Sequence, residues 1–230
     1  MHNEESTAEQ TLTEIYHTFT SHKVFFEIIV VESGSEDRTA NIIKKLSGEI
    51  KNLRSFHSDR REGYRNDLIK GLRNCISPKI LMVDSGKKFQ MSDLLKIYES
   101  SSDLDLVIGR RINRKDQKYR VILSRFYCIF LRYFHKLNFD LDADSGLSVI
   151  SKRFKDFIVT SSPVFSYLYR SEMAILCLKH NYKFSQVNVS YFKRKGKSRG
   201  LPNSKLIGII FTVLKDNFKL RKKLKSLDIF

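Results

Sequence analysis

The sequence is poor in cysteine and has no long apolar run. Its three cysteines, Cys75, Cys128 and Cys177, stand far apart, without the close pairs that a zinc site or a disulfide framework requires. We therefore expect reduced thiols, packed as small core residues in a cytosolic protein. No stretch reaches the roughly 18 consecutive apolar residues of a membrane-spanning helix. The polar, acidic residues after Met1 do not resemble a secretory signal.

Acidic residues are also few relative to basic ones. The chain has 42 Lys and Arg against 25 Asp and Glu, a net charge of +17. This excess favours polyanionic partners, which include nucleic acids, anionic lipid surfaces and phosphorylated substrates. The basic residues are scattered and no nucleic-acid-binding module is recognisable, so we expect no nucleic acid partner. At 230 residues, 41% of them hydrophobic, the chain can form one substantial domain.

One short apolar run ends in a carboxylate. Residues 79–83 precede Asp84, Ser85 and Gly86, a pattern typical of a buried strand that ends in a turn. In open α/β sheets, ligands bind beyond the carboxyl ends of the strands, where Asp84 would lie. An aspartate after a strand is also common turn chemistry, so this stretch alone leaves both roles open.

Expected strands alternate with expected helices along the chain. Such alternation predicts βαβ units and an α/β fold with a mixed, mostly parallel sheet. The segment 119–139 interleaves aromatic and basic residues at helical spacing, which suits a core helix and a membrane-surface helix equally. We expect one domain over 1–203 and a basic, amphipathic helical tail over 204–230. The strands are expected at 25–31, 53–57, 79–84, 105–109, 147–150 and 186–192, and the helices at 3–20, 40–46, 60–74, 92–99, 119–139, 171–180 and 204–230.

Seven stretches resemble, in the same order, the motifs of one family. They are Asn3-Glu4-Glu5, Val31 to Thr39, Gly63 with Gly71, Val83 to Gly86, Val107 to Arg111, Asp142 to Leu147, and Lys193 to Arg199. The family they resemble is the family 2 glycosyltransferases of the GT-A fold, particularly the polyprenyl-phosphate (dolichol-phosphate) sugar transferases. Each motif alone is weak, but seven in order, over residues 3–205, form a specific signal.

The resemblance implies an activity and a set of site residues. The activity is transfer of a sugar, with inversion, from a UDP- or GDP-linked donor to a polyprenyl phosphate or another membrane-linked glycan acceptor. The enzyme would work at the cytoplasmic face of a membrane, attached peripherally to its anionic surface. The implied donor-binding residues are Asn3, Glu4, Glu32, Ser33, Asp37, Gly63, Asp84, Ser85 and Lys88; the implied general base is Asp142 or Asp144; and the implied acceptor-binding residues are Arg110, Arg111, Lys193, Arg194 and Ser198.

The expected metal motif is incomplete. The resemblance implies a Mg²⁺ or Mn²⁺ ion held at Asp84, but Gly86 stands where the family has a second aspartate. A single carboxylate holds such an ion poorly. We therefore hypothesise that Lys87 or Lys88 neutralises the donor diphosphate in place of the metal. The alternative is a catalytically inactive relative that acts as a binding or scaffold subunit.

The first motif also has an unusual position. In the family, the residues that correspond to Asn3-Glu4-Glu5 close the first strand, which lies inside the sheet. We expect a sheet that lacks this strand, with unpaired edges on the two neighbouring strands. Such a gap is hard to reconcile with stable folding, so we expect either additional upstream residues or a compensating element.

Overall fold

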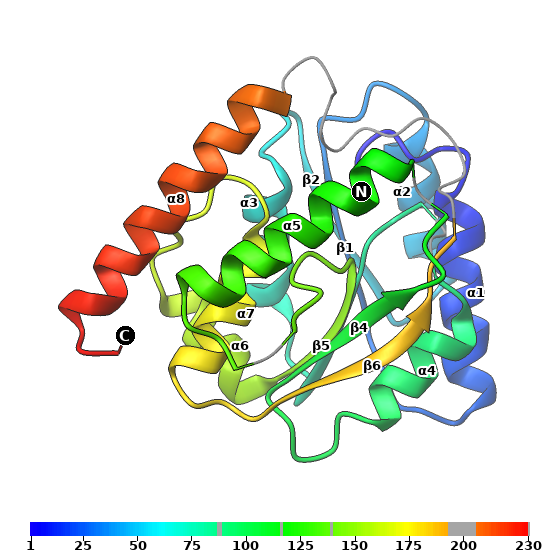
Figure 1. Ribbon diagram of the computed structural model, residues 1–230. Helices are drawn as coiled ribbons and strands as arrows, with labels where there is room; N and C mark the ends of the chain where they lie inside the picture. Colours follow the sequence, from blue (N-terminus) through cyan, green and yellow to red (C-terminus); the bar gives the residue numbers. More distant parts are fainter. Residues whose placement is uncertain (87–88, 116, 139, 193–205, 230) are drawn as a thin grey trace.

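The computed structural model describes residues 1–86, 89–115, 117–138, 140–192 and 206–229 (Figure 1). Strands alternate with helices, as the sequence predicts. The strands are β1 (Ile28–Ser33), β2 (Leu53–Ser58), β3 (Lys79–Val83), β4 (Leu106–Ile112), β5 (Leu147–Ser151) and β6 (Phe184–Ser190). The helices are α1 (Ala8–Ser21), α2 (Thr39–Glu49), α3 (Tyr64–Asn74), α4 (Met91–Glu99), α5 (Lys118–Phe134), α6 (Lys152–Thr160), α7 (Tyr169–Lys179) and α8 (Leu206–Ser226).

The sheet is divided into two parts. β1 and β2 form a parallel pair, while the larger part has the order β3-β5-β4-β6. In the larger part β5 runs antiparallel to both β3 and β4, and β4 runs parallel to β6. Within the described residues no strand joins β1 to β3. The expected gap in the sheet is therefore confirmed.

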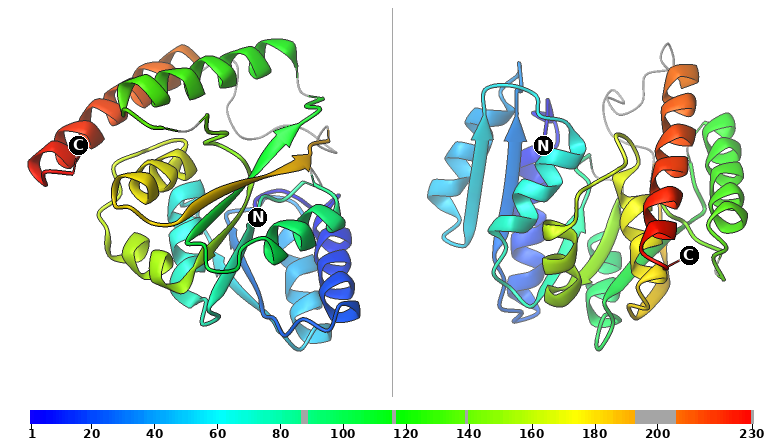
Figure 2. Two further views of the ribbon diagram at one scale, coloured as in Figure 1. Left: turned by 60° about the horizontal axis from the view of Figure 1, so that its bottom comes forward. Right: turned by 90° about the vertical axis from the view of Figure 1, so that its left-hand side faces the viewer.

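Helices cover the sheet in layers (Figure 2). In its right-hand view, α1, α2, β1 and β2 lie on one side of the molecule, and α5 and α8 form the outer layer on the opposite side. Between these layers, α7 is buried along nearly its whole length, and Tyr169, Met173 and Ile175 belong to the largest apolar cluster. A helix that is buried on all sides needs no polar face, which explains why its apolar residues show little periodicity.

Several expected boundaries are wrong, and one helix was not expected. The helix expected at 60–74 begins at Tyr64, and the one expected at 119–139 ends at Phe134. The first helix begins at Ala8 rather than at residue 3, because residues 3–7 form a turn in which the Glu4 carbonyl accepts hydrogen bonds from the amides of Thr7 and Ala8. β1 begins at Ile28 rather than at Phe25, whose side chain is fully exposed. Helix α6 was not expected, since it follows β5 directly, without a loop.

Among the described residues, no helix has the length and apolarity required to cross a membrane. The three cysteines are free thiols, and Cys177 is buried. Helix α8 contributes Leu220 and Leu224 to the largest apolar cluster. The second half of the chain's last helix is therefore packed against the domain.

Candidate active site

Asp84 stands directly after β3 and in contact with the glycine of another predicted motif. Its amide donates to the carbonyl of Gly146 over 2.8 Å. A Cβ atom at position 146 would lie only 2.3 Å from the Oδ2 of Asp84, so the approach of the two segments requires glycine. The Oδ1 of Asp84 accepts a hydrogen bond from the hydroxyl of Tyr64 (3.2 Å). Tyr64 follows Gly63, whose φ of +87° suits glycine.

Arg170, at the start of α7, is a site residue that the sequence reasoning missed. Its Nη2 lies 3.3 Å from the Oδ1 of Asp84, and its side chain is only 6% exposed. It also donates to the Oγ of Ser148 (2.7 Å) and, through Nε, to the hydroxyl of Tyr64. A buried arginine is almost always paired. Its partner lies 86 positions away, however, and no local sequence signal indicates the pair.

The two candidate bases, Asp142 and Asp144, have different surroundings. Asp142 is paired with an arginine. Its carboxylate accepts from the Nη2 (2.6 Å) and Nε (2.9 Å) of Arg111, and from the Arg111 amide (2.9 Å). Burial by itself would raise the pKa of Asp142, but the hydrogen bonds and charge of Arg111 outweigh burial and lower it. Asp142 is therefore ionised and serves to hold Arg111.

The pKa of Asp144 is shifted in the opposite direction, upward. Burial raises the pKa of its carboxyl group to about 6; the charges of Asp84 and Asp142 act in the same direction, while Arg111 and Arg170 oppose it. A carboxylate with such a pKa accepts a proton more readily than an ordinary aspartate near neutral pH. Of the two predicted bases, Asp144 is the better suited to proton transfer.

Glu32 lies at the end of β1 and organises the loop that follows. Its Oε1 accepts from the Ser35 amide (2.9 Å), and its Oε2 is hydrogen-bonded to His57. Burial favours the protonated acid, but the bonds from Ser35 and His57 outweigh it and keep the pKa of Glu32 low. The neighbouring Ser33 is fully buried and donates to Asp67 (2.7 Å), so its side chain points into the fold.

Hydrogen bonds join three predicted donor-binding stretches. The Oε1 of Glu4 accepts from the Oγ of Ser85 (2.9 Å), and the Oδ1 of Asn3 accepts from the Glu36 amide (2.7 Å). Asp37 accepts from the Thr39 amide (3.0 Å), at the first residue of α2. The N-terminal turn, the loop after β1 and the loop after β3 thus meet at one place.

The predicted acceptor-binding residues are only partly described. Arg110 is half exposed, and its Nη2 lies 3.0 Å from the Oδ2 of Asp140. Arg111 is buried against Asp142, with its guanidinium 5.3 Å from the centre of the Tyr191 ring. Lys88, Lys193, Arg194 and Ser198 lie outside the described residues.

A complete metal centre is not found among the described residues: no group of three or more His, Cys, Asp or Glu side chains there could hold an ion. Asp84 supplies one carboxylate, and Arg170 lies beside it. A divalent ion at this place would take most of its ligands from a bound diphosphate and from water, as Mg²⁺ commonly does.

The outer layer carries an unusual apolar surface, which we call the α5–α8 patch. Phe134 of α5 and Phe218 of α8 bring the two helices together, with their ring centres 4.8 Å apart. The exposed apolar residues recur at helical spacing on each helix, which indicates a continuous stripe. The patch consists of Tyr119, Ile122, Leu123, Phe126, Ile129 and Tyr133 on α5, and Ile207, Ile210, Phe211, Leu214 and Phe218 on α8.

Comparison with known proteins defines the family. Residues 1–154 match the model of glycosyl transferase family 2. The match covers more than half of the chain, which therefore belongs to this family and is a glycosyltransferase. No curated protein sequence matches the chain.

Solved structures confirm the GT-A fold. Glucosyl-3-phosphoglycerate synthase from Mycobacterium tuberculosis, solved with Mn²⁺, UDP-glucose and phosphoglyceric acid, has a TM-score of 0.65 and 21% identity, over 94% of this chain and 77% of that one. Mannosyl-3-phosphoglycerate synthase from Rubrobacter xylanophilus has a TM-score of 0.66 and 14% identity; the match covers 100% of this chain and 73% of that one. A mannosyltransferase from Pyrobaculum calidifontis, solved with GDP-Man and Mn²⁺, has a TM-score of 0.62 and 15% identity; the match covers 86% of this chain and 55% of that one.

Proposed function

We propose that this glycosyltransferase moves a sugar from a UDP- or GDP-linked donor to a polyprenyl phosphate or another membrane-linked glycan acceptor, with inversion. The observation that carries the choice of acceptor is the α5–α8 patch. Eleven exposed apolar side chains, on a protein with a net charge of +17, suit a helical layer that lies on an anionic membrane surface. The cytoplasmic face of a membrane is the place we propose for it.

The proposed reaction is a single displacement. An acceptor oxygen attacks the anomeric carbon as the bond from that carbon to the diphosphate breaks, and the electron pair leaves with the nucleoside diphosphate. A hydroxyl acceptor would give its proton to Asp144, whose pKa of about 6 leaves it largely ionised above neutral pH. A phosphate acceptor carries no such proton and would need cationic positioning, for which Arg110, Lys193 and Arg194 remain the candidates.

The donor would lie over the junction of the loops around Asp84. Glu32 at the end of β1 and the Glu4–Ser85 pair define the side for the nucleoside, and Arg170 supplies a buried positive charge near the place of the diphosphate. A Mg²⁺ or Mn²⁺ ion bound to Asp84 and the donor would neutralise the leaving diphosphate. Mn²⁺ is present in two of the solved structures named above.

Vesicle experiments test the acceptor class. We expect the protein to float with vesicles that contain anionic lipid, to release at high salt, and to glycosylate polyprenyl phosphate in those vesicles. The matched arm uses a soluble phosphorylated acceptor, phosphoglycerate, without vesicles. Sugar transfer to phosphoglycerate, together with no vesicle binding, would contradict the membrane-linked acceptor and leave the glycosyltransferase assignment intact.

A second candidate is a donor-binding subunit that does not catalyse transfer. Gly86 in place of a second aspartate, and the pairing of Asp84 with Arg170, favour it. A rise in melting temperature with a nucleotide-sugar, combined with neither hydrolysis nor transfer over an acceptor panel, would support this candidate. Turnover with any acceptor would exclude it.

A further inference from the structure

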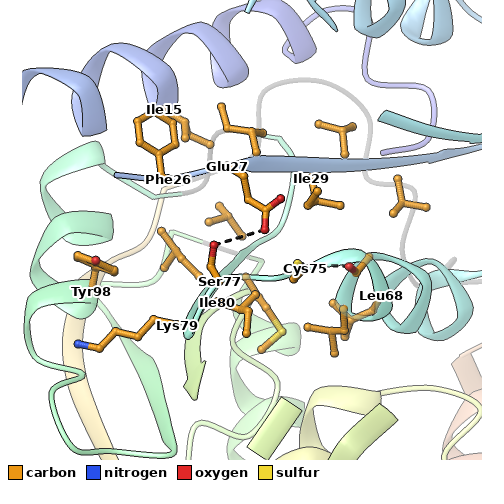
Figure 3. Close-up of a pocket in the computed structure, with 18 of the residues that line it drawn as sticks. Ile15, Phe26, Glu27, Ile29, Leu68, Cys75, Ser77, Lys79, Ile80 and Tyr98 are labelled. Atoms are coloured by element: carbon orange, nitrogen blue, oxygen red, sulfur yellow. Dashed lines mark hydrogen bonds between the residues drawn. The ribbon is translucent and has the colours of Figure 1, made fainter. Parts of the chain in front are cut away.

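Arg170 lines the cavity between β1 and β3 together with Tyr64 and Asp84. Much of the wall of this cavity is apolar, with Ile29 and Ile80 among its residues (Figure 3). Apolar side chains offer a guanidinium group no hydrogen-bond acceptor. The position of Arg170 therefore depends on its polar partners and on the backbone segment that carries it.

The segment that leads into Arg170 is the loop over residues 161–168, which joins α6 to α7 and which we call the α6–α7 loop. Its last residue, Leu168, has a φ of +53° and a ψ of +40°, in the left-handed region. A branched side chain is strained in this region, so such a residue persists where surrounding contacts hold it. The Leu168 carbonyl accepts from the amide of Ser171 (2.8 Å), in the first turn of α7. The contacts of this loop therefore set the start of α7, and with it the place of Arg170.

One of these contacts comes from α8. The Oδ2 of Asp216 accepts a hydrogen bond from the amide of Ser166 (2.7 Å), and Asp216 is only 2% exposed. It is the only acidic residue between Leu206 and Ser226, in a stretch rich in lysine. Burial of a carboxylate is costly unless the group is hydrogen-bonded, and its bond to an N–H group is a strong one. The Asp216–Ser166 bond is thus a specific connection between α8 and the α6–α7 loop.

The loop is also held from the side of α3. The Nη1 of Arg65 donates to the carbonyl of Phe165 (3.2 Å), whose side chain is fully buried. Arg65 directly follows Tyr64, whose hydroxyl contacts Arg170. The α6–α7 loop therefore lies between α8 and α3, with Ser166 four positions before Arg170.

We propose that Asp216 is a positioning residue for Arg170. By holding the Ser166 amide, it fixes the α6–α7 loop and the start of α7, so that the guanidinium of Arg170 stays against Asp84 and Tyr64. The proposal rests on the role of Arg170 at the donor diphosphate, which belongs to the proposed function. Since α8 also carries part of the α5–α8 patch, the Asp216–Ser166 bond connects the outer layer of the molecule to the donor site.

Hydrogen exchange at the Nε–H group of Arg170, followed by NMR on the folded full chain, tests the positioning directly. Asp216→Leu removes the acceptor and replaces a buried charge by an apolar side chain, a change that is often neutral or stabilising. We expect it to accelerate exchange at Arg170 by roughly tenfold or more. Asp216→Asn keeps an acceptor oxygen and should restore the slow exchange. Arg170→Lys, which lacks the Nε–H group, identifies the signal.

Leu224→Ala is the matched control. Leu224 is 1% exposed within the largest apolar cluster, so its truncation destabilises α8 without removing a hydrogen bond of the loop. Exchange at Arg170 that is unchanged in Asp216→Leu, or equally fast in Leu224→Ala, would overturn the proposal. If Asp216→Leu does not fold, Asp216→Ala takes its place. Failure of both to fold would assign Asp216 to the fold itself and would also overturn the proposal.

Donor titration separates the role of Asp216 from that of Arg170. With UDP-glucose and GDP-mannose as probes, Asp216→Leu should weaken donor binding by roughly tenfold. It should have no further effect in the Arg170→Met background; an equal loss in that background would overturn action through Arg170. If neither probe binds the unmodified chain, or if Arg170→Met binds as tightly as that chain, the proposed donor site fails. The exchange measurement then decides by itself whether Asp216 positions Arg170.

Discussion

The guanidinium of Arg170 lies against the carboxylate of Asp84, with 3.3 Å between Nη2 and Oδ1. The pair joins the start of α7 to the end of β3, and both residues contact Tyr64. It places a fixed positive charge beside the carboxylate that the family resemblance assigns to the donor diphosphate. The centre of the site is therefore the Asp84–Arg170 ion pair, and not the Asp84 carboxylate alone.

Replacement of Arg170 should affect both stability and donor binding. We expect Arg170→Met to lower the free energy of unfolding by about 1–3 kcal/mol, because it leaves the Asp84 charge and Ser148 without their partner. Arg170→Lys keeps the charge but loses the several-pronged contact, and should weaken donor binding by about tenfold. Denaturant unfolding and donor titration measure the two effects. In the double variant with Asp84→Asn the stability losses should be less than additive; full additivity would show that the two residues are not coupled.

Asp144 should control the pH dependence of transfer to a hydroxyl acceptor. Its carboxylate form increases as the pH rises through about 6, so kcat should rise over the same range. Asp144→Asn should lower kcat by about 10²-fold or more. Asp142→Asn is the comparison variant: it releases Arg111 and removes a negative charge that raises the pKa of Asp144, so the rise in kcat should remain but move to lower pH. A pH profile that keeps its rise near 6 in Asp144→Asn would contradict the assignment.

The pKa of Asp144 should also affect the pH dependence of protein stability, which can be measured without an activity assay. Its pKa is higher in the folded state than the ordinary 3.8, so folding favours the protonated form. Its contribution to stability is present below pH 3.8 and is lost as the pH rises through about 6. Asp144→Asn should therefore gain stability relative to the unmodified protein between pH 4 and pH 7. If the stability difference between Asp144→Asn and the unmodified protein stays constant from pH 4 to pH 7, the Asp144 carboxyl group is solvated rather than buried.

Removal of divalent ions tests the metal. Asp84 alone would hold an ion weakly, so an ion at this place depends on the donor diphosphate for further ligands; if such an ion is used, activity needs Mg²⁺ or Mn²⁺ at roughly millimolar concentration and is lost in EDTA. Activity that survives EDTA but disappears in Lys87→Ala or Lys88→Ala would show instead that lysine neutralises the diphosphate. Mn²⁺ added back to the EDTA-treated protein is the control for damage by the chelator.

The α5–α8 patch should determine vesicle binding. Phe126 is 66% and Phe211 69% exposed, so their replacement by serine leaves the core intact. We expect the double variant to lose vesicle binding by at least tenfold, since each buried large apolar side chain contributes about 1.5–3 kcal/mol, with an unchanged melting temperature. Phe25→Ser, at an exposed phenylalanine outside the patch, is the matched control. If the double variant and Phe25→Ser lose vesicle binding to the same extent, the α5–α8 patch is not the membrane contact.

Much of the fold could be predicted from local sequence. The strand before Asp84, a helix within 60–74 and the order of strands and helices follow from short apolar runs and from turn residues, which act over a few positions. The gap in the sheet followed from the family motif at Asn3. Helix α6 was missed because Ser151 caps it directly at the end of β5, through a 3.1 Å bond to the Phe154 amide, with no loop residues to mark the change.

The site could be predicted only in part, because its chemistry depends on pairs that are distant in the sequence. The motifs indicated Asp84 and Asp144 as candidate site residues, but their different surroundings come from burial at Asp144 and from the contact of Asp84 with Arg170. Nothing in the local sequence distinguishes Asp142, which is held by Arg111, from Asp144, which is not. Such a distinction requires the three-dimensional arrangement.

The most direct test of the account is a thermal-shift panel of UDP- and GDP-sugars, with and without Mn²⁺, on the full chain and on Asp84→Ala. We predict that one nucleotide class raises the melting temperature by roughly 5–10 °C at about 100 times its Kd, which corresponds to about 2.7 kcal/mol of added stability. The shift should disappear in Asp84→Ala. A folded protein whose melting temperature responds to no nucleotide-sugar, under any metal condition, would contradict the assignment of the Asp84 site to a nucleotide-sugar donor.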